Sequence, residues 1–429
     1  MHQLSKINKH WSIILALTLA VVISWNYWLP MAEDFYNLVT PADENRQSPL
    51  RNVDFFAYFN AGARFEKGEN PYFYGDTASR NFSDYIYPPT LLPLYGLISN
   101  LEYDQARLLW VGLYFTGYAL CFSLLLLAAK KELRSIFFSC GLVLMSASFP
   151  LLMHIHNGQS DVLVISLVLI GYVAYIKGFK TGSAFLFALA TMTKVSPVLF
   201  LIYFVIFLKD YRFLITYGLW VAGIVLVSLL AVPFSLYMDY ILRVLPEISK
   251  ADSYWLNQSI IKFLSASQGS LAEVISLGGF VLFGLFAFWL SKRYPSSLRI
   301  PGKTLGEKHI ISESVFILNI LVILIFSGKA WSMAYVWIIL PAALLVTRLI
   351  NSRPKTWYLI LVCASVFLME SKVYGYPILD SLNLWGSLML STLLVISLTK
   401  DAWAYDEIIE DPLPSVPKRE TENLPKGEN

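Results

Sequence analysis

Charged residues are scarce in this chain of 429 residues. Asp, Glu, Lys and Arg together make up 15% of it, hydrophobic residues make up 56%, and the mean hydropathy is +0.56. A soluble domain carries about 25% charged residues, so this composition excludes an ordinary soluble domain. No polar stretch is long enough to fold into a separate soluble catalytic module. The composition therefore predicts one all-α polytopic membrane domain.

Cysteine is also scarce, and the sequence shows no internal repeat. Cys121, Cys140 and Cys363 lie far apart in apolar runs. Three scattered thiols provide neither a disulfide framework nor the spacing of a metal site, and we interpret them as packing residues. The absence of a repeat disfavours an inverted-repeat transporter. The net charge of +3 gives no reason to expect nucleic acid as a partner.

The chain does have a series of apolar runs near the roughly 20-residue length that crosses a bilayer. The expected crossings are 11–29, 104–129, 135–153, 159–176, 182–193, 195–208, 213–234, 271–290, 312–328, 332–350, 356–370 and 383–399. Basic residues precede the first run and no small-residue cleavage pattern follows it, so we expect a retained anchor. The short pair 182–193 and 195–208 can also be interpreted as one broken helix.

Lysine and arginine determine the expected orientation. If the short run 88–101 does not cross and the N-terminus is cytoplasmic, most of the 33 Lys and Arg residues fall on the inner side. We therefore interpret 88–101 as a re-entrant or interfacial element, with about twelve crossings elsewhere and both ends inside. The membrane domain is expected to span 1–400, with outer loops 30–87 and 235–270. Residues 401–429 form a polar tail that is expected to be disordered in the cytoplasm.

Asp54 is the strongest catalytic candidate. It lies in a polar and aromatic stretch of the first outer loop, beside the membrane. A hydroxyl group is a poor nucleophile, and a carboxylate within hydrogen-bond reach can take its proton, which contributes roughly 10²–10⁴-fold to a rate. Aromatic neighbours such as Tyr58 would pack at the membrane surface and restrict water. The alternative is structural, since Asp is a favoured N-cap and a short helix is expected to begin here.

Two further polar stretches lie on the outer side. Tyr87-Pro88-Pro89 has a rigid backbone, which suits a wall beside a substrate or an interfacial helix start with a tyrosine in the aromatic belt. Asn157-Gly-Gln-Ser-Asp161 lies at a helix junction. The Asn157 and Gln159 amides offer the paired donors and acceptors that suit sugar hydroxyls, although a plain polar turn is an equal possibility.

Lysines provide the candidate anion site. Lys194 lies between two apolar runs, and a charge at the centre of a membrane costs about 2.5–3.5 kcal/mol on insertion scales, so it is a functional-site candidate. The alternative is a lysine at a helix end whose ammonium group reaches water. Lys329 and the pair Asn257-Gln258 share its outer side in the expected topology. Either cation could meet a lipid phosphate.

Together these motifs resemble glycosyltransferase family 87, whose members are polytopic enzymes with the GT-C fold. Several are polyprenol-phosphate-mannose-dependent α-mannosyltransferases. The resemblance covers most of the membrane region, and the series is specific through its order and spacing. The motifs are Asp54-Phe55…Tyr58, Gly68-Glu-Asn-Pro-Tyr72, Tyr87-Pro-Pro, Asn157-Gly-Gln159, Lys194-Val-Ser-Pro197 and Asn257-Gln-Ser259.

The resemblance implies a GT-C-type bundle of about twelve transmembrane helices with an extended first outer loop. It implies an inverting transfer of a hexose, with mannose expected first, from a polyprenyl-phosphate sugar to a glycolipid or glycan acceptor. The active site would face the periplasm or the exterior of an inner (plasma) membrane. It also implies that Asp54 is the general base and that no metal or other cofactor is needed.

The expected substrate contacts follow from the same series of motifs. Lys194 and Lys329 would bind the donor phosphate. The sugar and the acceptor would contact the remaining polar and aromatic side chains of the motifs, namely Tyr58, Tyr87, Asn157, Gln159, Asn257 and Gln258.

One late stretch departs from the family pattern. Relatives often carry a Ser-Pro-x-x-Trp-x-His-His-like segment, and here Ser327 and Trp331 fit while the histidine positions hold Met333 and Ala334. Lys329 and Tyr335 are the candidate replacements. A transporter or flippase of a lipid-linked or polar solute is the main alternative function, and it predicts polar residues through the middle of many helices. A non-enzymatic scaffold would leave the matched series of motifs unexplained.

Overall fold

The computed structural model describes most of the membrane region. The described residues are 53–72, 85–250, 257–265, 269–299, 310–352, 356–371 and 381–399, together with Thr18, Val22 and Leu305. The predicted first crossing at 11–29 and the predicted tail at 401–429 lie outside this set, apart from those two single residues. Within it every named element is helical, and the only β pairing is two isolated bridges, Ala129–Leu305 and Asn257–Trp331. The all-α prediction is confirmed.

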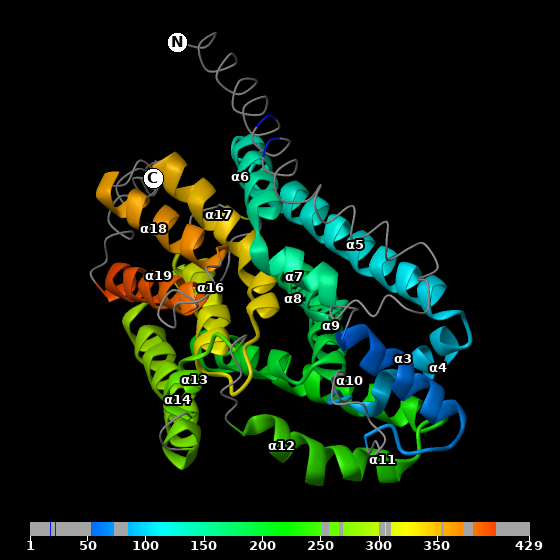
Figure 1. Cartoon of the computed structure of the whole chain (residues 1–429). Coiled ribbons are helices and arrows are strands. Elements are labelled where there is room, and N and C mark those ends of the chain that lie inside the picture. Colours follow the sequence, from blue (N-terminus) through cyan, green and yellow to red (C-terminus); the bar gives the residue numbers. More distant parts are fainter. Residues whose placement is uncertain are drawn as a thin grey trace, which may run out of the picture.

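The helices follow the apolar runs of the sequence (Figure 1). The first half contains α3 (Val53–Glu66), η1 (Pro89–Leu91), α4 (Leu92–Ser99), α5 (Tyr103–Ala128), α6 (Arg134–Ala147), α7 (Phe149–Asn157), α8 (Asp161–Ile176), α9 (Lys180–Thr193), η2 (Ser196–Phe200), η3 (Ile202–Phe207) and α10 (Tyr211–Ser228). The second half contains α11 (Phe234–Asp239), η4 (Tyr240–Val244), α12 (Leu245–Ser249), α13 (Ile260–Ser265), α14 (Gly269–Arg293), α15 (Ser296–Arg299), α16 (Ile310–Phe326), η5 (Ser332–Tyr335), α17 (Val336–Ser352), α18 (Thr356–Met369) and α19 (Leu382–Thr399).

Five of the described helices are long and apolar enough to cross a membrane. These are α5, α10, the 271–293 part of α14, the 332–351 segment of η5 and α17, and α19. The pair α6–α7 counts as a sixth span if its two parts are taken together across a 61° bend. Other apolar helices, such as α8 and α16, have only 10–17 residues. The count of about twelve crossings therefore stays a prediction.

The breaks between helices agree with the sequence interpretation. The run at 88–101 forms η1 and α4, and the apolar segment Pro89–Ser99 rises about 16 Å, against about 30 Å of hydrocarbon core. This is the short element expected of a re-entrant or interfacial segment. The pair 182–193 and 195–208 is interrupted at Lys194, whose backbone is extended between α9 and η2.

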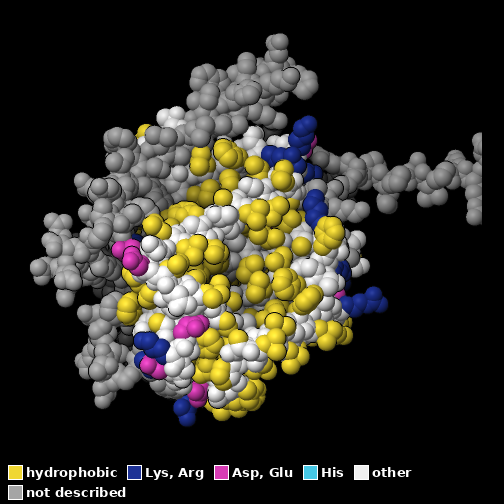
Figure 2. All heavy atoms as spheres, turned by 90° about the vertical axis from the view of Figure 1, so that its right-hand side faces the viewer, with side chains coloured by type: hydrophobic (Ala, Val, Ile, Leu, Met, Phe, Trp, Pro, Cys, Tyr) yellow, Lys and Arg dark blue, Asp and Glu magenta, His cyan; other side chains and the backbone are white. Residues whose placement is uncertain are grey.

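The interior and the surface of the bundle are made by different helices. The 332–351 segment lies almost wholly inside the protein, whereas α10 is mostly on the surface and exposes Leu219, Leu226 and Val227. Figure 2 shows one face of the molecule, where hydrophobic side chains cover most of the centre and charged ones lie mostly toward the edges. Such an extended exposed apolar surface is rare on soluble monomers. It is the surface expected of a protein embedded in lipid.

Helix α3 is held against α4 by a close backbone approach. A Cβ atom on Gly62 would lie 2.2 Å from the carbonyl oxygen of Tyr95, so only glycine permits this distance. Tyr87 and Pro88 directly precede η1, which leads into α4. Because α3 begins with the segment that carries Asp54, this contact determines where that carboxylate lies.

Candidate functional site

The junction between α7 and α8, residues 157–161, is the centre of the site. Helix α7 ends at Asn157, and Gly158 caps it with a left-handed backbone at φ 63°. A Cβ on Gly158 would lie 2.7 Å from the Cβ of Phe55 on α3. Glycine is thus required here both for the backbone angle and for the approach of α3. The indole of Trp110 donates a hydrogen bond to the Gly158 carbonyl at 2.8 Å, which fixes the junction on α5 as well.

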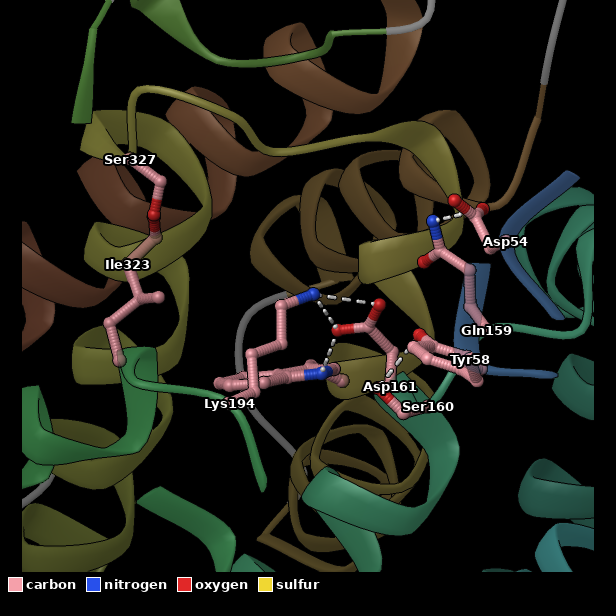
Figure 3. Close-up of polar contacts among 9 residues, drawn as sticks. Asp54, Tyr58, Gln159, Ser160, Asp161, Lys194, Ile323 and Ser327 are labelled. Carbon is pink, nitrogen blue, oxygen red and sulfur yellow. Dashed lines mark hydrogen bonds and ion pairs between the residues drawn. The ribbon is translucent and has the colours of Figure 1, made fainter. Parts of the chain in front are cut away.

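Asp54 lies directly against this junction (Figure 3). Its carboxylate Oδ2 accepts a hydrogen bond from Gln159 Nε2 at 2.7 Å. Gln159 is buried, while Asp54 is half-buried. Helix α3 begins at Val53, so Asp54 lies within its first turn, where the helix dipole also stabilises a carboxylate. Two of the predicted site residues, far apart in the sequence, are in direct contact.

Aromatic side chains form a wall beside Asp54. The Tyr58 hydroxyl donates to Ser160 Oγ at 3.2 Å, and its ring lies 5.1 Å from that of Tyr87 and stacks on Tyr95 at 5.2 Å. Burial raises the pKa of Tyr87 well above its usual value, and the nearby carboxylates of Asp54 and Asp161 add to this shift. Tyr87 therefore stays protonated and lies within the field of both acids.

Lys194 has a partner that sequence reasoning did not assign. Its Nζ donates to both carboxylate oxygens of Asp161, at 2.7 and 2.9 Å (Figure 3). The indole Nε1 of Trp337 donates to Asp161 Oδ1 at 3.0 Å. The Asp161 side chain is 1% exposed and that of Lys194 is 21% exposed. The ammonium group is thus held at the end of α9 by an internal ion pair.

A cavity of about 280 Å³ opens beside this ion pair. Its polar lining includes Lys194, Lys329, Asp161 and Tyr87, and its apolar lining includes Leu199 and Phe280. The remaining lining residues are Ile86, Pro88, Val195, Ser196, Tyr240, Leu245, Ile248, Ser276, Ile323, Leu324, Ser327, Gly328, Ala330, Trp331, Ala334 and Trp337. Both predicted phosphate-binding lysines therefore face one cavity. Neither Asp54 nor its partner Gln159 is among the lining residues.

The lysine at 329 is positioned by the loop that follows α16. Asn257 Nδ2 donates to the carbonyl oxygen of Gly328 at 2.9 Å, and Asn257 Oδ1 accepts from the backbone N–H of Ala330 at 3.1 Å. The backbone N–H of Gln258 donates to the Ala330 carbonyl at 2.7 Å. Asn257 and Gln258 are fully buried and do not line the cavity. The Asn257 amide, which we predicted to contact sugar, binds the backbone of this loop.

Met333 and Ala334, at the positions that hold histidine in the late motif of relatives, have different surroundings. Met333 Sδ is 4.0 Å from the Nδ2 donor of Asn157, while Ala334 lines the cavity. Of the two candidate replacements for the histidine, Lys329 lines the cavity. Tyr335 instead donates its hydroxyl hydrogen to the Gln258 carbonyl at 3.0 Å and is buried.

The site residues that sequence reasoning missed are Asp161 and Trp337. A signal for Asp161 was present, because an acid at the start of one apolar run and a lysine at the end of another reach similar depths in a membrane and would pair there. Trp337 lies in an apolar run with no polar neighbour that would draw attention to it. Within the described ranges, no group of three or more His, Cys, Asp or Glu side chains is placed to hold a metal ion.

Comparison with known proteins identifies one family. The sequence model of glycosyltransferase family 87 matches residues 85–371, which is more than half of the chain. No curated protein matches the chain. The matched range includes the 157–161 junction, Lys194 and Lys329, whereas Asp54 precedes it.

Proposed function

The chain belongs to glycosyltransferase family 87 and is a membrane glycosyltransferase, and we propose that it transfers a hexose from a polyprenyl-phosphate sugar. Mannose is the proposed sugar, and the acceptor is a glycolipid or a glycan. The reaction takes place at the outer face of an inner (plasma) membrane, on the periplasmic or extracellular side.

The observation that carries this proposal is the lining of the cavity. Two lysines face a space whose other walls are largely apolar, including Leu245, Ile323 and Leu324. Lysine ammonium groups bind phosphate oxygens as point charges. Apolar walls suit the first isoprene units of a prenyl chain, which gain free energy when they leave water. A lipid-linked phosphate satisfies both kinds of lining, whereas a free nucleotide sugar leaves the apolar walls unmatched.

Asp54 is proposed as the general base for the acceptor hydroxyl. The acceptor oxygen forms a bond to the anomeric carbon of the sugar while the bond from that carbon to the phosphate oxygen breaks. Asp54 takes the hydroxyl proton, and the polyprenyl phosphate leaves with the bonding electron pair. The 2.7 Å hydrogen bond from Gln159 and the place of Asp54 in the first turn of α3 hold the carboxylate in position. A single displacement of this kind inverts the anomeric configuration.

The lysines are proposed to stabilise the leaving group. Negative charge develops on the phosphate oxygen as the glycosidic bond breaks, and fixed cations near that oxygen lower the barrier most when water is excluded. Lys194 is held in position by Asp161, and Lys329 by the loop that Asn257 binds. Tyr87 connects the cavity to the aromatic wall beside Asp54, since it lines the cavity and its ring is 5.1 Å from that of Tyr58.

A reconstituted transfer assay tests this function. Purified full-length protein in proteoliposomes is supplied with polyprenyl-phosphate mannose and a membrane lipid extract, and products are identified by mass spectrometry. We expect a new mannosylated lipid or glycan and one equivalent of free polyprenyl phosphate. A protein that used only nucleotide sugars would contradict the proposed donor. Movement of intact lipid-linked sugar across the bilayer without a covalent product would instead favour the transporter alternative.

A further inference from the structure

Asp161 is a buried carboxylate at the edge of a cavity that is proposed to bind an anion. Its side chain is 1% exposed, and it lines the same cavity as Lys194 and Lys329. A negative charge in this position opposes phosphate binding, so its presence needs a reason. We propose that Asp161 sets the charge of the cavity so that the singly charged donor binds and the more highly charged product is released. This inference rests on the proposed function.

The carboxylate of Asp161 has support that does not depend on Lys194. The carboxylate is held by Lys194 at 2.7 and 2.9 Å and independently by Trp337 Nε1 at 3.0 Å. It is also the first residue of α8, where the helix dipole favours a negative charge. A phosphate oxygen can therefore draw the ammonium group away without leaving Asp161 unsupported.

The charged lining of the cavity amounts to one excess positive charge. Lys194 and Asp161 neutralise one another, and Lys329 supplies the remainder among the described lining residues. Glu247 on α12 does not line the cavity and is paired with Lys250 at 2.5 Å. A lining with one excess positive charge matches one negative charge on the ligand.

Donor and product differ in charge. The phosphodiester of a polyprenyl-phosphate sugar carries one negative charge. The polyprenyl phosphate that leaves is a monoester, and with a second pKa near 6 a phosphate monoester carries about −1.5 to −2 at pH 7. The one excess positive charge of the lining therefore neutralises the charge of the donor but not the larger charge of the product. Because Asp161 repels the additional charge, it promotes departure of the product.

Binding of two short-chain probes to the purified full-length protein tests this inference without relying on turnover. The probes are farnesyl phosphate, a monoester, and its methyl diester, titrated by calorimetry against protein in neutral-lipid nanodiscs. Asp161→Asn keeps the shape and the acceptor oxygen for Trp337 but removes the charge. We expect Asp161→Asn to bind the monoester about tenfold or more tightly than the wild type, because a unit charge a few ångströms away changes binding energies by well over 1 kcal/mol. The gain for the diester should be smaller, since the interaction scales with the charge of the ligand.

A double-variant comparison separates this role from a purely structural one. The monoester affinity should be highest in Asp161→Asn and lowest in Lys194→Met alone. The wild type and the double variant Asp161→Asn with Lys194→Met, each with one excess positive charge, should lie between them. A residue that only positions Lys194 would instead give weaker binding in Asp161→Asn. If Asp161→Asn does not fold, the comparison between the double variant and Lys194→Met still decides, and equal affinities there would overturn the inference.

The two proposals fail in different ways. If the wild type binds neither farnesyl compound, the proposed phosphate site is wrong and the inference falls with it. If the wild type binds both compounds and Asp161→Asn gains nothing for the monoester, the proposed function stands and the role given to Asp161 is wrong.

Discussion

At the scale of single residues, the ion pair of Asp161 and Lys194 explains how an apolar run can end in a lysine. An isolated charge in a membrane interior is costly, and Lys194 pairs with Asp161 before any substrate arrives. The sequence left two possibilities for this lysine, a phosphate ligand or a side chain that reaches water. The structure combines a buried counter-ion with a place in the cavity wall. Lys194 is therefore paired and positioned in the free protein.

Gly158→Ala is expected to destabilise the protein. The substitution places a Cβ in a left-handed backbone conformation and 2.7 Å from the Cβ of Phe55. A non-glycine residue in this conformation costs roughly 1–2 kcal/mol before any clash. We expect a lower midpoint of thermal unfolding, measured by intrinsic fluorescence. The control is Gly112→Ala within α5, where no atom lies within 4 Å of the added Cβ, and this change should leave the midpoint unchanged or raise it.

Lys329→Met is expected to weaken use of the donor. The variant removes one of the two cations that line the cavity, and a charge-assisted contact to phosphate contributes on the order of 1.5–3 kcal/mol. We expect kcat/KM for the polyprenyl-phosphate sugar to fall by about tenfold or more. Lys67→Met, which changes an exposed lysine after α3, is the matched control. Equal kinetics for the two variants would remove Lys329 from the proposed site.

At the scale of elements, polar groups of the site come from breaks between helices. The 157–161 junction, the extended residue between α9 and η2, and the loop after α16 each contribute polar groups. Polar backbone at such breaks needs partners inside the protein. Asn257 provides them for the loop that holds Lys329, through the carbonyl of Gly328 and the N–H of Ala330. A side chain predicted to contact sugar thus has a demonstrated structural task.

Helix α10 is expected to show a pH-dependent stability through its cap. Asp210 is the N-cap, and its side chain accepts from the Phe213 N–H at 3.1 Å. Partial burial acts to raise the pKa of this carboxyl, but hydrogen bonds from Lys180, Tyr175 and Phe213 outweigh it and hold the pKa below its usual value. Because the folded-state pKa is lowered, this stabilisation is fully present above the unfolded value of about 3.9 and is lost as the pH falls through the folded value.

The matching measurement compares Asp210→Ala with the wild type across this acidic range. Loss of the cap should cost about 1 kcal/mol at neutral pH, and the exposed Lys180 partner adds little because such pairs are screened by solvent. The difference in unfolding midpoint should shrink as the pH falls below the folded pKa. A difference that stays constant down to the lowest pH measured would show that the carboxylate charge is not involved.

The lengths of the apolar runs predicted most of the helices, but they could not predict how the helices contact one another. Each expected crossing from 104–129 onward contains helix, with limits within a few residues of the prediction for α5 and α19. The 61° bend between α6 and α7 lies inside one expected crossing. It follows from Ser148 capping α7, with Pro150 in the first turn, which a hydropathy pattern does not register.

At the scale of the whole molecule, the site depends on pairs that are far apart in the sequence. Asp54 meets Gln159, and Asp161 meets Lys194 and Trp337. Residue types and motif order predicted that Asp54, Gln159 and Lys194 belong together. They did not predict which polar groups satisfy one another, because that depends on helix packing. The counter-ion of Lys194 was missed for this reason.

The expected orientation predicts which side of the membrane each exposed loop faces. Cys121, Cys140 and Cys363 are first replaced by alanine, and single cysteines are then placed at Lys67 and at Glu132, both of which are exposed. A membrane-impermeant maleimide added to intact cells with a permeable outer envelope should label position 67 and spare position 132. The reverse pattern would place the candidate site on the cytoplasmic side and contradict the proposed location.

The rate of sugar transfer by Asp54→Asn tests the central claim most directly. Asn has nearly the same shape as Asp and can accept the hydrogen bond from Gln159, so a structural role for Asp54 predicts nearly normal turnover. A general base predicts that kcat falls by roughly 10²–10⁴-fold while the unfolding midpoint and donor binding stay close to wild type. Asp104→Asn, which changes another acid in the first turn of a helix, controls for a general effect of lost charge. Turnover within a few-fold of wild type in Asp54→Asn would contradict the account.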